Sequence, residues 1–270
     1  MSTHTNDRTI ECAIDINAEP DVVWQALTTE NGLNNWFSYQ SKVTPGVGGS
    51  LYVAWGDFGG GASITKWDPP RHMQMLENRG PYVEASTLEP VDITVDYFIE
   101  ARDGGCELRI VQAGLGPEAD WDGEYNATIA DWPMFMSVAA HYAEHHALRH
   151  PGLVRTVNSL ATTCTNAAGS TWTRLVGGTT PVPGEPCTLT IGDTTVEGTA
   201  LLVQDGSRVI VDVPALNDGT LVATVSGNGE QSRLSLVLST WAAADSALEA
   251  TTAAIESALE AMSGTRVEPA

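Results

Sequence analysis

The first half of the chain alternates between two spacings of apolar residues. Residues 8–16 place apolar side chains at every second position, which predicts a strand with one buried face. Residues 20–37 place them three and four positions apart, and Asn31 with Gly32 divides this stretch into two predicted short helices. Turn-forming Gly, Pro and Asp residues then separate five further predicted strands: residues 50–55, 62–67, 72–76, 91–101 and 106–113. The short connections predict antiparallel hairpins.

A long helical period follows at residues 120–147, where apolar positions form one stripe. At 1.5 Å per residue, such a helix reaches about 40 Å. Because proline is tolerated in the first turn of a helix, Pro133 predicts that the helix proper begins near Asp131; a kink at Pro133 is the alternative. A strand series followed by an amphipathic helix predicts an α+β domain, in which an antiparallel sheet buries the apolar stripe of the helix.

The order of elements repeats in the second half. The stretch HPGL at residues 150–153 breaks the long helix, and a strand, a short helix, five strands and a final amphipathic helix are predicted after it. The motif WTRL in this half echoes WQAL in the first helix. We therefore interpret the chain as two domains, residues 1–150 and 151–270, of which the second is a degenerate copy of the first. An unrelated α+β domain is the alternative. Few aromatic and many small residues predict a filled or small cavity in the second domain.

The charge of the chain excludes several partners. Its formal net charge is −21, and only two of its 270 residues are lysine. Phosphate groups would be repelled, so we expect neither nucleic acid nor an anionic membrane surface as a partner. The chain has no apolar run of about 18 residues that could span a membrane, and its first residues lack the features of a signal peptide. We expect a cytoplasmic protein whose charge serves solubility.

Few residues suggest chemistry. The four cysteines are scattered without a CxxC pair, which argues against a zinc ribbon or a dithiol motif. The stretch HYAEH at residues 141–145 formally matches the H-x-x-E-H zinc motif, but no third ligand is apparent, and a solvated helix end is the favoured interpretation. Three carboxylates are candidates for acid–base work in a cavity: Asp57, Glu84 and Asp96. Solvated side chains are the favoured interpretation for these too. We predict no catalytic residue, metal ion or cofactor.

Four stretches in order carry a family resemblance over about the first half of the chain. They are INAEPDVVWQALTTENGLNNWF, ITKWDPPRHMQM, DYFIEARDGGCELRIVQAGL and DWPMFMSVAAHYAE. The chain resembles the helix-grip fold of the SRPBCC (START-like, birch-pollen-allergen-like) superfamily. Within it, the chain is most similar to the family named for homologues of the activator of the heat-shock protein 90 ATPase.

The resemblance implies a helix-grip fold, in which a curved antiparallel sheet grips the long C-terminal helix, with a hydrophobic cavity between them. The repeated order of elements then predicts two such modules in tandem. It implies that Trp36 and Trp55 lie near the mouth of the cavity. Gln112 stands where the family commonly has His, and Glu77 stands where it commonly has Trp. The predicted ligand-binding residues are Trp36, Trp55, Met73, Met75, Tyr97, Gln112, Trp132 and Phe135.

Three functions are compatible with these observations. The favoured hypothesis is the binding of a hydrophobic or amphipathic small molecule without chemistry, because a mostly apolar cavity with a few polar groups is the usual small-molecule site. Tyr97 and Gln112 are the expected polar contacts. A polyketide cyclase- or hydrolase-like enzyme would need a polar pair facing the cavity. A chaperone-associated protein-interaction module would show an exposed apolar patch. A homodimer is also left open.

Overall fold

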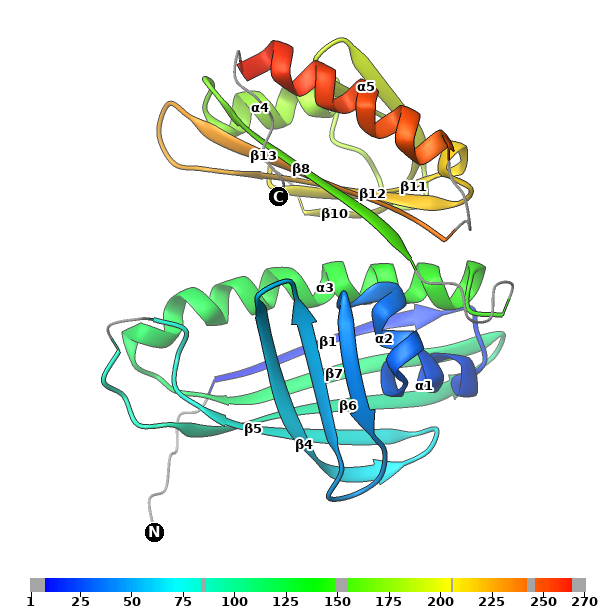
Figure 1. Ribbon diagram of the computed structural model, residues 1–270, viewed down its shortest axis with the longest axis vertical. Helices are drawn as coiled ribbons and strands as arrows, with labels where there is room; N and C mark the ends of the chain where they lie inside the picture. Colours follow the sequence, from blue (N-terminus) through cyan, green and yellow to red (C-terminus); the bar gives the residue numbers. More distant parts are fainter. Residues whose placement is uncertain (1–7, 84–85, 149–154, 205, 242–245, 264–270) are drawn as a thin grey trace. The chain divides into compact units, whose positions relative to one another are not determined.

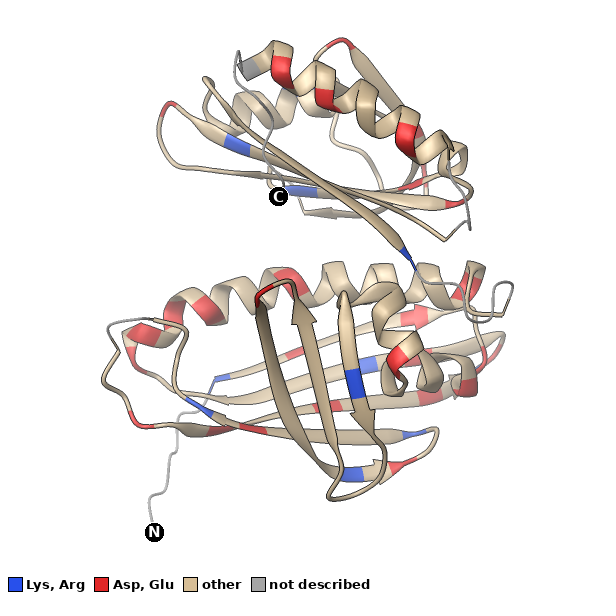
Figure 2. Ribbon diagram, in the orientation of Figure 1, with Lys and Arg blue, Asp and Glu red and all other residues tan. Residues whose placement is uncertain are grey.

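The structure is a computed structural model that describes residues 8–83, 86–148, 155–204, 206–241 and 246–263. The chain forms two compact units, Met1–Gly152 and Leu153–Ala270. Figure 1 shows that each unit is built from one sheet with helices. Acidic side chains are spread over the strands and helices of both units, with few basic ones among them (Figure 2).

The first unit is one antiparallel sheet of seven strands with a long helix against it. The strand order is β1-β7-β6-β5-β4-β3-β2, so the first strand pairs with the last and the others follow as hairpins. Its elements are β1 (Arg8–Ile16), α1 (Pro20–Thr28), α2 (Glu30–Trp36), β2 (Gln40–Thr44), β3 (Ser50–Trp55), β4 (Phe58–Asp68), β5 (His72–Arg79), β6 (Val91–Arg102), β7 (Gly105–Leu115), η1 (Ala119–Trp121) and α3 (Asp122–His145).

The break between α1 and α2 falls at Thr29, so the expected division at Asn31 and Gly32 is wrong. Thr29 has an extended backbone, and its hydroxyl caps α2 by accepting a hydrogen bond from the N–H of Gly32 at 3.0 Å. Gly32 lies inside α2, where a Cβ would come within 2.3 Å of the carbonyl oxygen of Gln25. Glycine therefore serves close packing of the two helices rather than an interruption.

Helix α3 begins at Asp122, so the expected start near Asp131 is wrong. Asp122 and Glu124 lie in the first turn, where acidic side chains favour the positive end of the helix dipole. Pro133 lies inside the helix and removes one backbone donor, but Ile129, four residues earlier, is at an exposed position where water can replace that donor. The helix packs against β1 (Figure 1).

The second unit repeats this topology with six strands. Its strand order is β8-β13-β12-β11-β10-β9, so the first strand again pairs with the last. This confirms the predicted α+β fold of two modules in tandem. Its elements are β8 (Thr156–Cys164), α4 (Ala168–Leu175), β9 (Pro186–Ile191), β10 (Thr194–Gln204), β11 (Arg208–Val213), η2 (Pro214–Leu216), β12 (Gly219–Ser226), β13 (Ser232–Thr240) and α5 (Ser246–Ser263).

The core of the second unit is made mainly of aliphatic side chains. Leu189, Val209 and Leu236 from the sheet and Ile255 from α5 are fully buried together. The buried Trp172 belongs to the same cluster and comes from α4, as the WTRL motif indicates. The sheet and α5 therefore bury mostly aliphatic side chains against each other.

Candidate ligand-binding site

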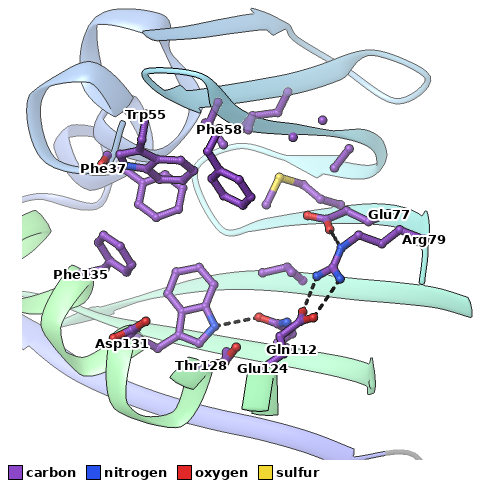
Figure 3. A pocket seen from close by; sticks show the side chains of 18 of the residues that line it. Phe37, Trp55, Phe58, Glu77, Arg79, Gln112, Glu124, Thr128, Asp131 and Phe135 are labelled. Carbon is purple, nitrogen blue, oxygen red and sulfur yellow. Dashed lines mark hydrogen bonds and ion pairs between the residues drawn. The ribbon is translucent and has the colours of Figure 1, made fainter. Parts of the chain in front are cut away.

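A cavity of about 310 Å³ lies in the first unit between the sheet and α3. Its walls come from five neighbouring strands, β3 to β7, from the end of α2 and from the first half of α3. Figure 3 shows the aromatic side chains of Phe37, Trp55 and Phe135 at one end of this cavity, with Asp131 beside Phe135, and the ion-paired Glu77, Arg79 and Glu124 at the other. The site therefore combines an apolar body with a polar end.

Phe37, at the end of α2, is the centre of the aromatic cluster. Its ring centroid lies 4.9 Å from that of Trp55 and 4.8 Å from that of Phe135, both in edge-to-face geometry. The ring of Trp132 is nearly parallel to it at 6.2 Å. The indole N–H of Trp55 donates to the carbonyl oxygen of Phe37 at 2.8 Å, which fixes both residues. A ligand with a planar aromatic ring could pack against these rings in the same stacked or edge-to-face geometry.

The cavity reaches solvent beside Phe58 and Tyr82. These two side chains line the cavity, yet they are 56% and 59% exposed, and their ring centroids lie 5.6 Å apart. Gly60 lies next to them on β4, and a Cβ added there would meet only the Tyr82 hydroxyl, at 4.0 Å. The missing side chain at Gly60 therefore keeps part of the cavity open.

An ion-pair cluster forms the polar end. The Nε–H of Arg79 donates to Glu77 at 2.8 Å, and its Nη1 and Nη2 donate to the two carboxylate oxygens of Glu124 (Figure 3). Burial alone would lower the pKa of Arg79. The hydrogen bonds that Arg79 donates to Glu124 and Glu77 outweigh burial and raise that pKa. The Tyr82 ring covers the guanidinium at 4.0 Å. Arg79 is therefore a fixed cation held between two carboxylates.

Tyr97, Gln112 and Trp132 form a second polar contact on the floor of the cavity. The indole N–H of Trp132 donates to Oε1 of Gln112 at 2.9 Å. The rings of Tyr97 and Trp132 meet edge to face at 6.2 Å. Burial raises the pKa of Tyr97, and the Glu77 carboxylate raises it further, so its phenol stays protonated at neutral pH.

Six of the eight predicted residues line this cavity: Trp55, Met75, Tyr97, Gln112, Trp132 and Phe135. Trp36 does not lie near the mouth, so that expectation is wrong. It is 1% exposed, and its indole N–H donates to the carbonyl oxygen of Ala26 at 2.9 Å, which holds α2 on α1. Met73 is fully buried in the sheet's core and is not part of the lining.

Most lining residues were not among the predicted ones, and those that give the cavity its further aromatic and ion-pair character are Phe37, Phe58, Glu77, Arg79, Tyr82 and Glu124. For β5 the signal was present. Strand side chains at every second position share a face, so the inward row that holds Met75 continues into Glu77 and Arg79. The charges of these two residues suggest an outer face, but Arg79 pairs with both Glu77 and Glu124, and this pairing lets the charged side chains point inward.

Of the three carboxylates considered for acid–base work, the two that the structure describes, Asp57 and Asp96, do not line the cavity. Asp96 is 9% exposed and bonds Nε2 of His72 at 2.6 Å and the amide of Gln74 at 3.0 Å, so its interpretation as a solvated side chain is wrong. Asp57 is exposed in the turn between β3 and β4. Glu84 lies outside the described residues.

The histidine-rich end of α3 is more buried than expected. His141 and His146 are each 3% exposed, so the interpretation of a solvated helix end is wrong for these two. His141 lies inside the segment Met136–Ala143, in which every position of α3 is buried, and His146 follows at the end of the helix. Within the described residues, no three His, Cys, Asp or Glu side chains are grouped so that they could hold a metal ion.

None of the helices in the described ranges combines the length and the apolar character that crossing a bilayer requires.

The strand order, the long helix and the enclosed cavity together define a helix-grip domain. Residues 17–138 match the family described as "Activator of Hsp90 ATPase homolog 1-like protein". The first unit is therefore a domain of this family, within the SRPBCC superfamily, as the sequence motifs predict. No curated protein sequence matches the chain.

Several solved structures are similar to this chain. Protein MLL2253 from Mesorhizobium loti is 22% identical, with a TM-score of 0.44, over 54% of this chain and 100% of its own. Two others extend over both units. DynU16, described as a putative protein in the dynemicin biosynthetic locus, is 14% identical over 94% of this chain and 95% of its own, with a TM-score of 0.43. BexL, described as a di-domain ARO/CYC, is 14% identical over 96% and 99%, with a TM-score of 0.44.

Proposed function

We propose that the first unit binds a hydrophobic or amphipathic small molecule in the cavity between its sheet and α3, without chemistry. The observation that carries this proposal is the aromatic-lined cavity of about 310 Å³ that reaches solvent beside Phe58 and Tyr82. Small-molecule sites are typically apolar cavities of about 300–1,000 Å³ with a few polar groups. Cores that only stabilise a fold are close-packed and leave few voids larger than a water molecule.

The arrangement of the cluster supports binding. Phe37 meets Trp55 and Phe135 edge to face, and all three residues still line the cavity wall. Burying apolar surface gains about 25 cal/mol per Å², so a ligand that covers these rings gains free energy in proportion to the area covered.

A fluorescence titration tests the proposal. N-phenyl-1-naphthylamine is a neutral apolar dye that brightens when it leaves water, and we expect saturable brightening with the wild-type protein. Gly60→Leu places a side chain in the space described above and should weaken binding at least about tenfold, which corresponds to about 1.4 kcal/mol. Gly169→Leu is the matched control, because Gly169 lies in α4 of the second unit with no atom within 4 Å of its added Cβ.

Two outcomes would count against the proposal. One is the absence of saturable brightening with the wild-type protein. The other is an equal affinity of the wild type and Gly60→Leu, which would place the dye outside the cavity. Circular dichroism on both leucine variants shows whether they are folded.

One observation favours a second candidate function, a cyclase- or hydrolase-like enzyme. Glu77 and Glu124 are ionisable groups that line the cavity together with Gln112. Positioned carboxylates can move protons to and from a bound molecule. Mass analysis of a molecule released from the protein separates the two functions, because a binding protein returns it unchanged. Conversion that is lost in Glu124→Gln would favour the enzyme.

A further inference from the structure

Two buried polar groups on the cavity floor have unused hydrogen-bonding capacity. Tyr97 and Gln112 are 3% and 7% exposed, and both line the cavity. In the described part of the chain, the Tyr97 hydroxyl and the Gln112 amide nitrogen have no hydrogen-bond partner. Neither atom is sealed off from solvent, so a molecule that enters the cavity can reach both.

The contact with Trp132 decides which end of the Gln112 amide is available. An indole N–H can only donate, so the amide oxygen must face Trp132, at 2.9 Å. The amide NH2 group is therefore the end left for a ligand (Figure 3). Gln112 offers a hydrogen-bond donor to the cavity.

Tyr97 offers a second donor. Its hydroxyl stays protonated at neutral pH, because burial and the nearby Glu77 carboxylate both disfavour the phenolate. A ligand that displaces water from the cavity would leave this hydroxyl without a partner unless the ligand brings an acceptor for it.

The sheet register places the two donors next to each other. Gln112 on β7 lies directly opposite Val95 on β6, and Tyr97 lies two residues further along the same face of β6. Diagonal neighbours of this kind have Cα atoms roughly 7–8 Å apart, within reach of long side chains. One oxygen atom between them can accept from both groups.

The charges around the cavity decide the charge of the ligand. Glu77, Glu124 and Asp131 all line the cavity. The one guanidinium among the described lining residues, Arg79, already bonds the two glutamates. A carboxylate ligand would place a further negative charge next to this cluster, which is unfavourable at such short range. A neutral oxygen acceptor has no such cost.

We propose that Tyr97 and Gln112 together bind the carbonyl oxygen of a neutral, planar, largely aromatic ligand. The rings of this ligand would lie against Trp132 and Phe135, which line the cavity beside the two donors. This assignment rests on the proposed binding function and adds the chemical class of the ligand. It commits to an uncharged carbonyl group rather than a carboxylate or an amine.

Three probes with one ring system test the assignment. Fluorene and 9-fluorenone differ by a CH2 group against a C=O group, and fluorene-9-carboxylate adds a negative charge. Their affinities are measured by displacement of N-phenyl-1-naphthylamine. With the wild type we expect 9-fluorenone to bind roughly 3- to 10-fold more tightly than fluorene, as one or two net hydrogen bonds allow. The carboxylate should bind more weakly than 9-fluorenone.

Matched variants locate the effect. Tyr97→Phe and Gln112→Leu should each lower the affinity for 9-fluorenone severalfold and leave fluorene unchanged. Tyr52→Phe is the control, since Tyr52 is 44% exposed and is not part of the lining. Equal wild-type affinities for fluorene and 9-fluorenone would overturn the carbonyl assignment, and this arm requires no variant to fold. An equal loss of both probes in the variants would also overturn it. Failure of the dye itself to bind would instead overturn the binding function.

Discussion

Trp36 and Phe37 are adjacent aromatic residues that the structure assigns to different roles. Trp36 is 1% exposed and donates to the Ala26 carbonyl oxygen at 2.9 Å. Replacing a buried Trp by Ala typically costs about 3–5 kcal/mol, which includes the cavity left behind. A domain has only about 5–15 kcal/mol of stability in total, so Trp36→Ala should unfold the first unit at much lower denaturant concentration.

Phe37 is half-buried and faces the cavity. Phe37→Ala removes two edge-to-face contacts, with Trp55 and Phe135, each worth about 0.5–1.5 kcal/mol. We therefore expect a loss of about 1–3 kcal/mol in stability. Dye binding should weaken at least about tenfold, because the centre of the aromatic wall is gone.

Two assays on the same samples compare these effects. Urea denaturation followed by circular dichroism gives the stability of each variant, and titration with N-phenyl-1-naphthylamine gives the affinity. Trp36→Ala should show the larger drop in urea midpoint, and Phe37→Ala the larger loss of affinity per kcal/mol of stability. A Trp36→Ala protein as stable as Phe37→Ala, but with weaker dye binding, would refute the reasoning and move Trp36 to the binding wall.

Four further predictions concern other residues. Glu124→Gln removes a charged partner of the half-buried Arg79 and should cost about 1.5–3 kcal/mol in a urea titration; an unchanged midpoint would mean that this pair adds nothing. Burial raises the pKa values of Cys12 and Cys106 to about 11 from 9.0, so a thiol reagent at pH 8 should modify them only after unfolding. Because folding raises the pKa of both thiols, the folded protein favours their neutral form, and the stability that this contributes should be lost as the pH rises from about 9 to about 11. The loss should be smaller in Cys12→Ala. Leu236→Ala, at a fully buried position of the second unit, should cost about 2–5 kcal/mol there and leave dye affinity unchanged; a parallel loss of affinity would contradict an independent site.

Most of the architecture could be predicted from spacing. Alternation in residues 8–16 and the helical period before His145 predict the strand and the helix that the structure has, although α3 is buried on all sides from Met136 to Ala143. The strand β2 (Gln40–Thr44) was not predicted because it is short and mostly polar. The hydroxyl of its buried Ser41 donates to Oδ1 of Asn34 in α2 at 2.6 Å, a contact between a strand and a helix that the apolar pattern does not reveal.

At the start of α3, the rule that proline marks the first turn of a helix does not hold. Pro133 predicts a helix start because it removes a donor, yet that donor is missing at a solvent-accessible turn and costs little. The acidic first turn at Asp122 was the better signal.

The site was predictable where it follows from strand register, and less so elsewhere. Met75, Tyr97 and Gln112 lie on inward faces that alternation predicts. The choice between Trp36 and Phe37 depends on an acceptor, the Ala26 carbonyl oxygen, that exists only once α1 and α2 pack. Location in the cytoplasm, and a protein partner or homodimer, stay predictions.

Native mass spectrometry of the gently purified protein tests the central claim most directly. For the wild type we expect a reproducible mass excess over the bare chain that is lost on denaturation. The excess should be reduced in Gly60→Leu, whose added side chain would occupy the cavity, and unchanged in Gly169→Leu. A bare chain mass for the wild type, or the same excess in Gly60→Leu, would contradict the claim that this cavity holds a small molecule.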